Sequence, residues 1–148
     1  MIKIRPVLEV DIETFYEFQA DPVAAAMAVF GSRCREDHAA HWQKLRHDPD
    51  AVARTALTDG LVCGNLLSWS REGHRYVGYW IGREFWGRGI GTEALRLFVA
   101  EIETRPLWAH VVVANRGSQR VLEKCGFEQV EQRPSPADGL EEYVYRLG

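Results

Sequence analysis

The sequence has 148 residues, of which 46% are hydrophobic, and a formal net charge of −3. This length suffices for a domain that buries its own core without disulfides or a structural metal, so we expect a single domain over residues 1–148. The slight acidic excess argues against a nucleic-acid-binding protein, because such proteins usually carry a clear basic excess.

The N-terminal third predicts one short strand followed by helices. Residues 2–5 favour a strand that stops near Pro6, since proline cannot donate to a ladder. Asp11 is the expected N-cap of a first helix that ends before Pro22. Residues 23–35 predict a short helix and a loop. Residues 36–47 predict a second clear helix, whose inward positions are Ala39, Trp42 and Leu45.

Two histidines on this second helix raise the question of a metal site. His38 and His41 are three residues apart beside Glu36 and Asp37, a spacing that could hold a metal ion. Histidines among charged residues on a helix more often form a solvated face, and no matching Cys or carboxylate cluster occurs elsewhere. We therefore expect no metal.

The middle of the sequence predicts antiparallel strands joined by tight turns. Residues 51–58 and 61–69 read as two strands joined by Asp59-Gly60, which is the strongest short hairpin signal in the chain. Residues 71–73 form the next turn. Residues 76–81 are aromatic and β-branched and predict a further strand.

A glycine-rich segment follows this strand and opens a helix. Gly87, Gly89 and Gly91 alternate with other residues, and apolar side chains at helical spacing begin at Leu95. The first N–H groups of such a helix have no partner inside the helix and lie at the positive end of its dipole. This arrangement is typical of a phosphate-binding terminus.

The C-terminal third predicts a buried strand, a capped helix and two closing strands. Residues 107–114 form a continuous apolar run of the buried kind. Asn115 is the expected N-cap of a helix that ends with Gly126 at the C′ position. Residues 127–133 and 141–147 alternate and predict the closing strands. The whole pattern indicates a mixed α/β fold.

The motifs of the second half resemble those of one enzyme superfamily. The segments Arg88-Gly-Ile-Gly-Thr-Glu-Ala94, Asn115-Arg-Gly-Ser118 and Glu123-Lys-Cys-Gly-Phe127 are similar to the acetyl-CoA-binding core of the GNAT N-acetyltransferases, in the branch of the ribosomal-protein N-terminal acetyltransferases. The resemblance implies a mostly antiparallel sheet of six to seven strands with helices on both faces. It also implies acetyl-CoA as cosubstrate. One departure is Trp86, which stands where the superfamily usually has Gln or Arg.

Other nucleotide-binding motifs fit the glycine segment less well. Gly89-x-Gly91-x-x-Ala94 also matches the dinucleotide fingerprint, which expects an acidic residue at the end of the next strand about 20 residues on. That strand ends in Asn115 instead. No P-loop motif occurs in the sequence.

The resemblance implies a set of cofactor-binding residues. In this superfamily the strand at 76–81 and the strand ending at Asn115 splay apart, and pantetheine lies between them as an added strand would. The residues implied in cofactor binding are Ile81, Gly82, Arg83, Arg88, Gly89, Ile90, Gly91, Thr92, Asn115 and Ser118. Ser118 is also implied as the catalytic group that meets the departing thiolate. By the same resemblance, the residues implied in lining the acceptor site are Met27, Phe30 and Trp42.

The general base is not apparent in the sequence. Superfamily members often have a tyrosine on the helix after Asn115, but the matching position is Leu122. The start of the strand at 76–81 offers His74, Arg75 and Tyr76 where others have a glutamate. The base is therefore His74, a carboxylate outside the motifs, or a water chain.

The function implied is direct transfer of an acetyl group from acetyl-CoA to a primary amine, on a protein N-terminus or a small molecule, in a ternary complex. The missing tyrosine and glutamate favour an alternative, a non-catalytic acyl-CoA-binding module on the same fold. Three cysteines without C-x-x-C spacing, and no apolar run of 18 residues, predict a cytoplasmic protein without membrane contact. We expect a monomer or a homodimer.

Overall fold

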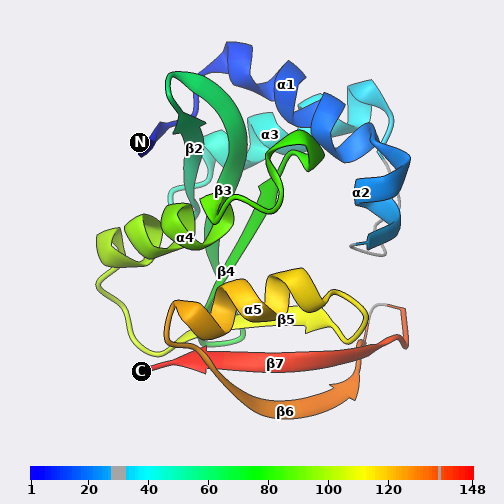
Figure 1. Cartoon of the computed structure of the whole chain (residues 1–148), viewed down its shortest axis with the longest axis vertical. Helices are drawn as coiled ribbons and strands as arrows, with labels where there is room; N and C mark the ends of the chain where they lie inside the picture. Colours follow the sequence, from blue (N-terminus) through cyan, green and yellow to red (C-terminus); the bar gives the residue numbers. More distant parts are fainter. Residues whose placement is uncertain (28–32, 137) are drawn as a thin grey trace.

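The computed structural model describes residues 1–27, 33–136 and 138–148. Helices and strands are mixed along the chain (Figure 1). The strands are β1 (Ile2–Pro6), β2 (Val52–Thr58), β3 (Leu61–Arg71), β4 (His74–Ile81), β5 (Leu107–Val112), β6 (Glu128–Pro134) and β7 (Glu141–Leu147). The helices are α1 (Glu9–Ala20), α2 (Pro22–Met27), α3 (Arg35–His47), α4 (Ile90–Glu101) and α5 (Arg116–Lys124), with a short 3-10 turn at Arg83–Phe85.

Within the described residues, seven strands form one sheet in the order β1-β2-β3-β4-β5-β7-β6. All neighbouring strands pair antiparallel except β4 and β5, which are parallel. The sheet therefore consists of two antiparallel parts that meet at one parallel pair. This agrees with the mostly antiparallel sheet of six to seven strands that the sequence predicts.

Two tight hairpins set the register of the first part. Asp59 and Gly60 both have positive φ, 49° and 83°, and close the β2–β3 hairpin as predicted. Glu72 and Gly73, with φ of 52° and 80°, close the β3–β4 hairpin in the same way. Both turns need left-handed backbone at two successive positions, and this conformation costs glycine least.

Helices cover both faces of the sheet. On one face, α1 is fixed by its Asp11 carboxylate, which accepts a hydrogen bond from Thr55 Oγ1 of β2 at 2.7 Å. On the other face, Gly91 in the first turn of α4 lies against Ile81 of β4 and Val121 of α5. The largest fully buried apolar side chains are Phe15, Leu66, Leu95, Phe98, Leu107 and Tyr145.

Three details of the N-terminal third differ from the predictions. Leu8 is the N-cap of α1, and Asp11 lies one turn further on, where its Oδ2 accepts from Leu8 N at 2.8 Å and from Arg5 at 2.6 Å. On α3, Ala39 is exposed and His38 is buried, because His38 and Trp42 together face α1. The prediction of a solvated His38 was therefore wrong.

The predicted acceptor-lining residues have different positions. Trp42 is buried and packs against Phe15 with ring centroids 4.9 Å apart, as a core side chain does. Met27 is exposed at the end of α2. Phe30 lies outside the described residues.

None of the helices in the described ranges is both long enough and apolar enough to span a bilayer.

Candidate functional site

The two parts of the sheet separate where β4 and β5 meet. These strands pair only at Arg75 with Leu107 and Tyr76 with Trp108. Beyond this point they run in different directions, as Figure 1 shows. The facing edges of β4 after Tyr76 and of β5 after Trp108 therefore have no ladder between them, and an extended ligand can bind there as an added strand. The predicted splay is confirmed.

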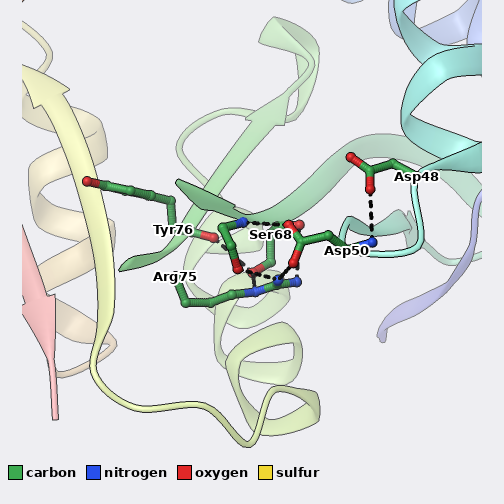
Figure 2. Close-up of polar contacts among 6 residues, drawn as sticks. Asp48, Asp50, Ser68, Arg75 and Tyr76 are labelled. Carbon is green, nitrogen blue, oxygen red and sulfur yellow. Dashed lines mark hydrogen bonds and ion pairs between the residues drawn. The ribbon is translucent and has the colours of Figure 1, made fainter. Parts of the chain in front are cut away.

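A polar cluster fixes the point of separation. Arg75 donates from Nε to Ser68 Oγ at 2.8 Å and from one terminal nitrogen to Asp50 Oδ1 at 3.0 Å. Ser68 Oγ in turn donates to the carbonyl of Tyr76 at 2.8 Å. Figure 2 shows this cluster on one side of β4, while the Tyr76 side chain points away from it. The branch of the sheet is thus tied to β3 and to the loop before β2.

A cavity of about 220 Å³ occupies the gap between the diverging strands. Its lining comes from β4, β5, α5 and β7, and the residues are Val77, Gly78, Tyr79, Ala109, His110, Val111, Val112, Asn115, Ser118, Leu122 and Glu142. The polar side chains around it form two groups. We call Tyr79, Asn115 and Ser118 the α5 wall, and His110 and Glu142, together with Arg133 that contacts both, the β7 wall.

The α5 wall is built by the start of α5. Asn115 caps the helix, its Oδ1 accepting from Ser118 N at 3.2 Å, as the sequence predicts. Gly126, with φ of 93°, and Phe127 close the other end: Gly126 N donates to the carbonyl of Glu123 and Phe127 N to that of Leu122. Both ends of α5 are therefore fixed, which holds Ser118 in place at the cavity.

Tyr79 joins this wall from β4. Its hydroxyl donates to Ser118 Oγ at 3.0 Å. Burial raises the pKa of Tyr79 to about 12, and the hydrogen bond to Ser118 opposes this rise. The phenol is therefore protonated throughout the physiological range and acts as a donor.

The β7 wall is charged. Glu142 is 7% exposed, and its Oε1 lies 3.2 Å from His110 Nδ1 and 3.6 Å from Arg133 Nε. The Arg133 contact is an ion pair and the His110 contact joins the carboxylate to an imidazole, and Oε1 has no partner with hydrogen-bond geometry among the described residues. A buried carboxylate oxygen in this state is costly unless a further donor arrives. Glu142 is thus suited to receive a cationic group.

His110 supports Glu142 in its neutral form. Burial lowers the pKa of His110, although the neighbouring Glu142 carboxylate opposes the shift. Arg133 lies 3.4 Å from His110 Nε2, and a guanidinium can only donate. Nε2 is therefore the acceptor and Nδ1 carries the proton, but the 3.2 Å contact of Nδ1 with Glu142 Oε1 does not have hydrogen-bond geometry.

The glycine loop lies beside the α5 wall. Gly89 is the N-cap of α4 with φ of 74°, and the first hydrogen bond of the helix joins Glu93 N to the carbonyl of Gly89. The N–H groups of residues 90–92 therefore have no partner within the helix. Gly91 lies next to Tyr79, since a Cβ at Gly91 would be 3.7 Å from Tyr79 Cε2. The start of α4 is therefore next to a residue that lines the cavity.

The remaining predicted cofactor residues do not line the cavity. Ile81 accepts a hydrogen bond at its carbonyl from the indole of Trp86 at 2.8 Å, and Gly82 N donates to Cys63 at 2.9 Å. A Cβ at Gly82 would lie 2.6 Å from the Phe18 ring, so helix packing explains this glycine. Arg83 pairs with Asp21 at 2.8 Å.

Arg88 lies at the outer side of the loop. It donates to the carbonyl of Glu84 at 3.2 Å and its guanidinium lies over the Phe85 ring. Among the described residues, no group of three or more His, Cys, Asp or Glu could hold a metal ion.

Comparison with known proteins identifies the fold and the family. Residues 2–128 match the family model described as an acetyltransferase (GNAT) domain. The chain belongs to the GNAT acetyltransferases. It is 32% identical over 102 residues to YdaF of Bacillus subtilis, whose name assigns it to the ribosomal N-acetyltransferases, and the match covers 63% of this chain and 55% of YdaF. The chain spans about half the length of the curated relatives it matches.

Solved GNAT structures share the whole architecture. The aminoglycoside acetyltransferase AAC(6')-Ib, solved with coenzyme A, superposes with a TM-score of 0.82 at 18% identity, over 97% of this chain and 94% of that chain. RimL, a ribosomal L7/L12 α-N-protein acetyltransferase solved with coenzyme A, gives 0.81 at 17% identity, over 99% and 93%. At this identity the likeness shows a common fold. The fold predicted from the sequence is confirmed.

The GNAT motifs lead to only part of the cavity lining. Asn115 and Ser118 were predicted from their motif and lie in the α5 wall. Tyr79, His110 and Glu142 were not predicted. Tyr79 is marked by its inward position between Val77 and Ile81 in the alternating strand, and His110 by its place within an apolar run. Glu142 gives no sequence signal, because a charge in an alternating strand normally faces solvent.

Proposed function

We propose that this GNAT chain transfers an acetyl group from acetyl-CoA to a primary amine by direct attack in a ternary complex. The observation that carries the proposal is the cavity at the β4–β5 divergence, which has hydroxyl donors on one wall and a buried carboxylate on the other. Acyl transfer to an amine needs both, because a base must remove a proton from the ammonium group and a donor must stabilise the departing thiolate.

The cofactor is proposed to lie along the α5 wall. The pyrophosphate binds the free N–H groups at the start of α4, where Gly89, Ile90, Gly91 and Thr92 leave the backbone accessible. Pantetheine follows the unpaired edge of β4 near Ile81, Gly82 and Arg83, with Arg88 at the outer side of the loop. Asn115 and Ser118 lie at the inner end of pantetheine, so that the thioester reaches the cavity.

The chemistry then uses both walls. The acceptor ammonium binds Glu142 and gives up a proton to it, and the free amine attacks the thioester carbonyl. As the carbon–nitrogen bond forms, the nitrogen loses a second proton to solvent, and the carbon–sulfur bond breaks to release a thiolate that accepts a hydrogen bond from Ser118. Glu142 is buried and its Oε1 has no hydrogen-bond partner among the described residues, which supports the second alternative for the base that the sequence leaves open, a carboxylate outside the motifs.

The acceptor class is proposed as a primary amine with its cationic group at the β7 wall. YdaF and RimL carry names of ribosomal-protein acetyltransferases, whereas AAC(6')-Ib carries that of an aminoglycoside acetyltransferase. The match to YdaF is the closer in sequence, which favours a protein N-terminal amine. Soluble peptides and proteins with a free N-terminal amine are therefore the first acceptors to test.

The test is CoA production from acetyl-CoA on addition of amines: short peptides with a free α-amine, an aminoglycoside and a simple alkylamine. CoA should be quantified by chromatography, because exposed Cys34 would react with a thiol reagent. We expect CoA release above the amine-free background with at least one class. Acetyl-CoA binding with no release for any amine would support the alternative of a non-catalytic binding module.

Cofactor class is tested separately by thermal unfolding. Acetyl-CoA at about 100 times its dissociation constant should stabilise the folded state by about 2.7 kcal/mol. NADH should stabilise it far less. Equal stabilisation by NADH would support the alternative interpretation of the glycine loop as a dinucleotide-binding loop.

A further inference from the structure

The hydrogen bond between Tyr79 and Ser118 joins two segments that are 39 residues apart. Tyr79 projects from β4 and Ser118 from the first turn of α5, and both line the cavity. The Tyr79 side chain is partly buried. In a hydrogen bond between two hydroxyls, one donates its proton and the other accepts. Which of them donates decides which hydroxyl proton is available to a ligand.

The phenol proton of Tyr79 is committed to Ser118 Oγ at 3.0 Å. The backbone N–H of Ser118 is committed to Asn115 Oδ1. A hydroxyl that accepts one hydrogen bond still has its own proton to donate. In the part of the chain that the structure describes, Ser118 Oγ has no hydrogen-bond acceptor for that proton. The Ser118 proton is therefore available to an atom in the cavity.

We propose that Tyr79 is a positioning residue for acetyl transfer, which by donating to Ser118 Oγ directs the Ser118 proton to the sulfur of the departing thiolate. This rests on the proposed function, since it assigns a role within the same cavity. It also accounts for Leu122, the position at which the GNAT resemblance implies a tyrosine. Here a phenol reaches the cavity from the opposite element, β4, while Leu122 contributes an apolar surface to the lining.

Proton affinities decide between donating a hydrogen bond and transferring a proton. An ordinary thiol has a pKa near 8.5, whereas that of Tyr79 is about 12. A thiolate therefore does not take the phenol proton at equilibrium. In the proposed step the carbon–nitrogen bond forms, the carbon–sulfur bond breaks, and the electron pair stays on sulfur. Glu142 receives the proton that the ammonium group gives up before the attack. The nitrogen loses a second proton to solvent as the intermediate collapses, and the thiolate leaves hydrogen-bonded to Ser118.

The first test measures the pKa of the CoA thiol in the binary complex, from the ultraviolet absorbance of the thiolate. Coenzyme A itself is the ligand, so no turnover is needed. Loss of one hydrogen bond in the chain predicts a thiol pKa higher by about 0.5 to 1 unit in Tyr79→Phe than in wild type. Ser118→Ala should raise it at least as much.

Tyr145→Phe is the matched control, because it removes the same group from another buried tyrosine, on β7, that does not line the cavity. The thiol pKa in this variant should equal that of the wild type. Equal thiol pKa values in wild type and Tyr79→Phe, with both proteins folded and saturated with CoA, would overturn the proposal.

The second test is a double-mutant cycle on kcat with an amine that the wild type acetylates. Tyr79→Phe should lower kcat by about 3- to 10-fold with an unchanged KM for acetyl-CoA. In the Ser118→Ala background it should have no further effect, because its action passes through that hydroxyl. In the Ser118→Thr background, which keeps a hydroxyl, Tyr79→Phe should again lower kcat by most of the factor seen in the wild type.

The outcomes separate this inference from the proposed function. Equal losses from Tyr79→Phe in both backgrounds would show a merely structural tyrosine and overturn the inference, while turnover itself would stand. A thiol pKa that responds to Tyr79, in a protein that acetylates no amine, would support the hydrogen-bond chain from Tyr79 through Ser118 to the sulfur and would overturn its role in acetyl transfer together with the proposed function.

Discussion

The two walls of the cavity differ in how completely their polar groups are paired. On the α5 wall, Asn115 and Tyr79 each make a hydrogen bond to Ser118, and both come from ends of well-packed elements. On the β7 wall, Oε1 of buried Glu142 contacts Arg133 and His110 but has no hydrogen-bond partner among the residues that the structure describes. The α5 wall is therefore organised before any ligand binds. The β7 wall reaches full pairing only with an added donor, which an ammonium group supplies.

The largest effect should come from the β7 wall. Glu142→Gln keeps the size of the side chain but removes its charge and its ability to accept the amine proton. We expect kcat/KM for the amine to fall by about 10²- to 10⁴-fold, the range of general-base contributions. Initial rates at saturating acetyl-CoA measure this.

Glu141→Gln is the control for this variant, because Glu141 is the exposed neighbour on the same strand. Its kcat/KM should match the wild type. A Glu142→Gln protein with wild-type kcat/KM would show that the β7 wall does not take part in the chemistry.

The α5 wall should give a smaller effect. A thiol is already a fair leaving group, so the hydrogen bond from Ser118 contributes modestly. Ser118→Ala should lower kcat by about 10- to 100-fold, roughly 1.4–2.7 kcal/mol of transition-state stabilisation. The KM for acetyl-CoA should change little. A loss of cofactor affinity at constant kcat would instead make Ser118 a binding residue.

The cofactor loop should affect binding rather than chemistry. A Cβ at Gly91 would meet only ordinary contacts, 3.5 Å from Val121 and 3.6 Å from Ile81, so Gly91→Val should fold. Its side chain would occupy the space beside the amides that we propose bind the pyrophosphate. We expect the Kd for acetyl-CoA to rise about tenfold, roughly 1.4 kcal/mol.

Calorimetry gives the Kd for this variant, and Ala100→Val at an exposed position near the end of α4 is the control. Unchanged affinity in a folded Gly91→Val protein would remove the loop from the cofactor site. Gly89 is a poorer test position, because its φ of 74° would strain any β-branched residue whether or not a ligand binds.

The smallest effect on activity should come from a titratable group outside both walls. Burial first, then the charges of His41 and Arg33, lower the pKa of His38 to about 4. Because the ordinary value is 6.5, the unfolded chain takes up this proton first as the pH falls. The contribution of neutral His38 to stability is therefore complete above pH 6.5 and is lost from there to about pH 4.

His38→Phe should therefore flatten the dependence of the free energy of unfolding on pH in that window, without changing kcat at pH 7.5. Urea unfolding at a series of pH values measures the slope. The same slope in wild type and variant would show that His38 titrates alike in the folded and unfolded chain.

Local signals in the sequence predicted the fold well. Asp59-Gly60 fixed one hairpin, Asn115 and Gly126 fixed both ends of α5, and the glycine loop fixed the start of α4. These features work because each depends on backbone conformations or caps that a few neighbouring residues determine. The N-cap of α1 was predicted at Asp11, one turn after the actual cap, Leu8. The Asp11 carboxylate accepts hydrogen bonds from Arg5 and Thr55 as well as from the backbone at the helix start.

The candidate site was only partly predictable, because its walls depend on distant pairs. Ser118 meets Tyr79 from another strand, and Glu142 meets His110 through the β5–β7 register. No local pattern reveals such a pair. The GNAT resemblance implies a tyrosine at the position that Leu122 occupies, whereas the phenol in this cavity comes from Tyr79 on β4.

The most direct test of the two-walled site is a crystal structure of the complex with coenzyme A. The account predicts the pyrophosphate at the N–H groups of residues 90–92, and the sulfur between β4 and β5 within hydrogen-bonding distance of Ser118 Oγ. Glu142 should face the sulfur from across the cavity. A sulfur bound outside this gap, with no contact to Ser118, would contradict the account.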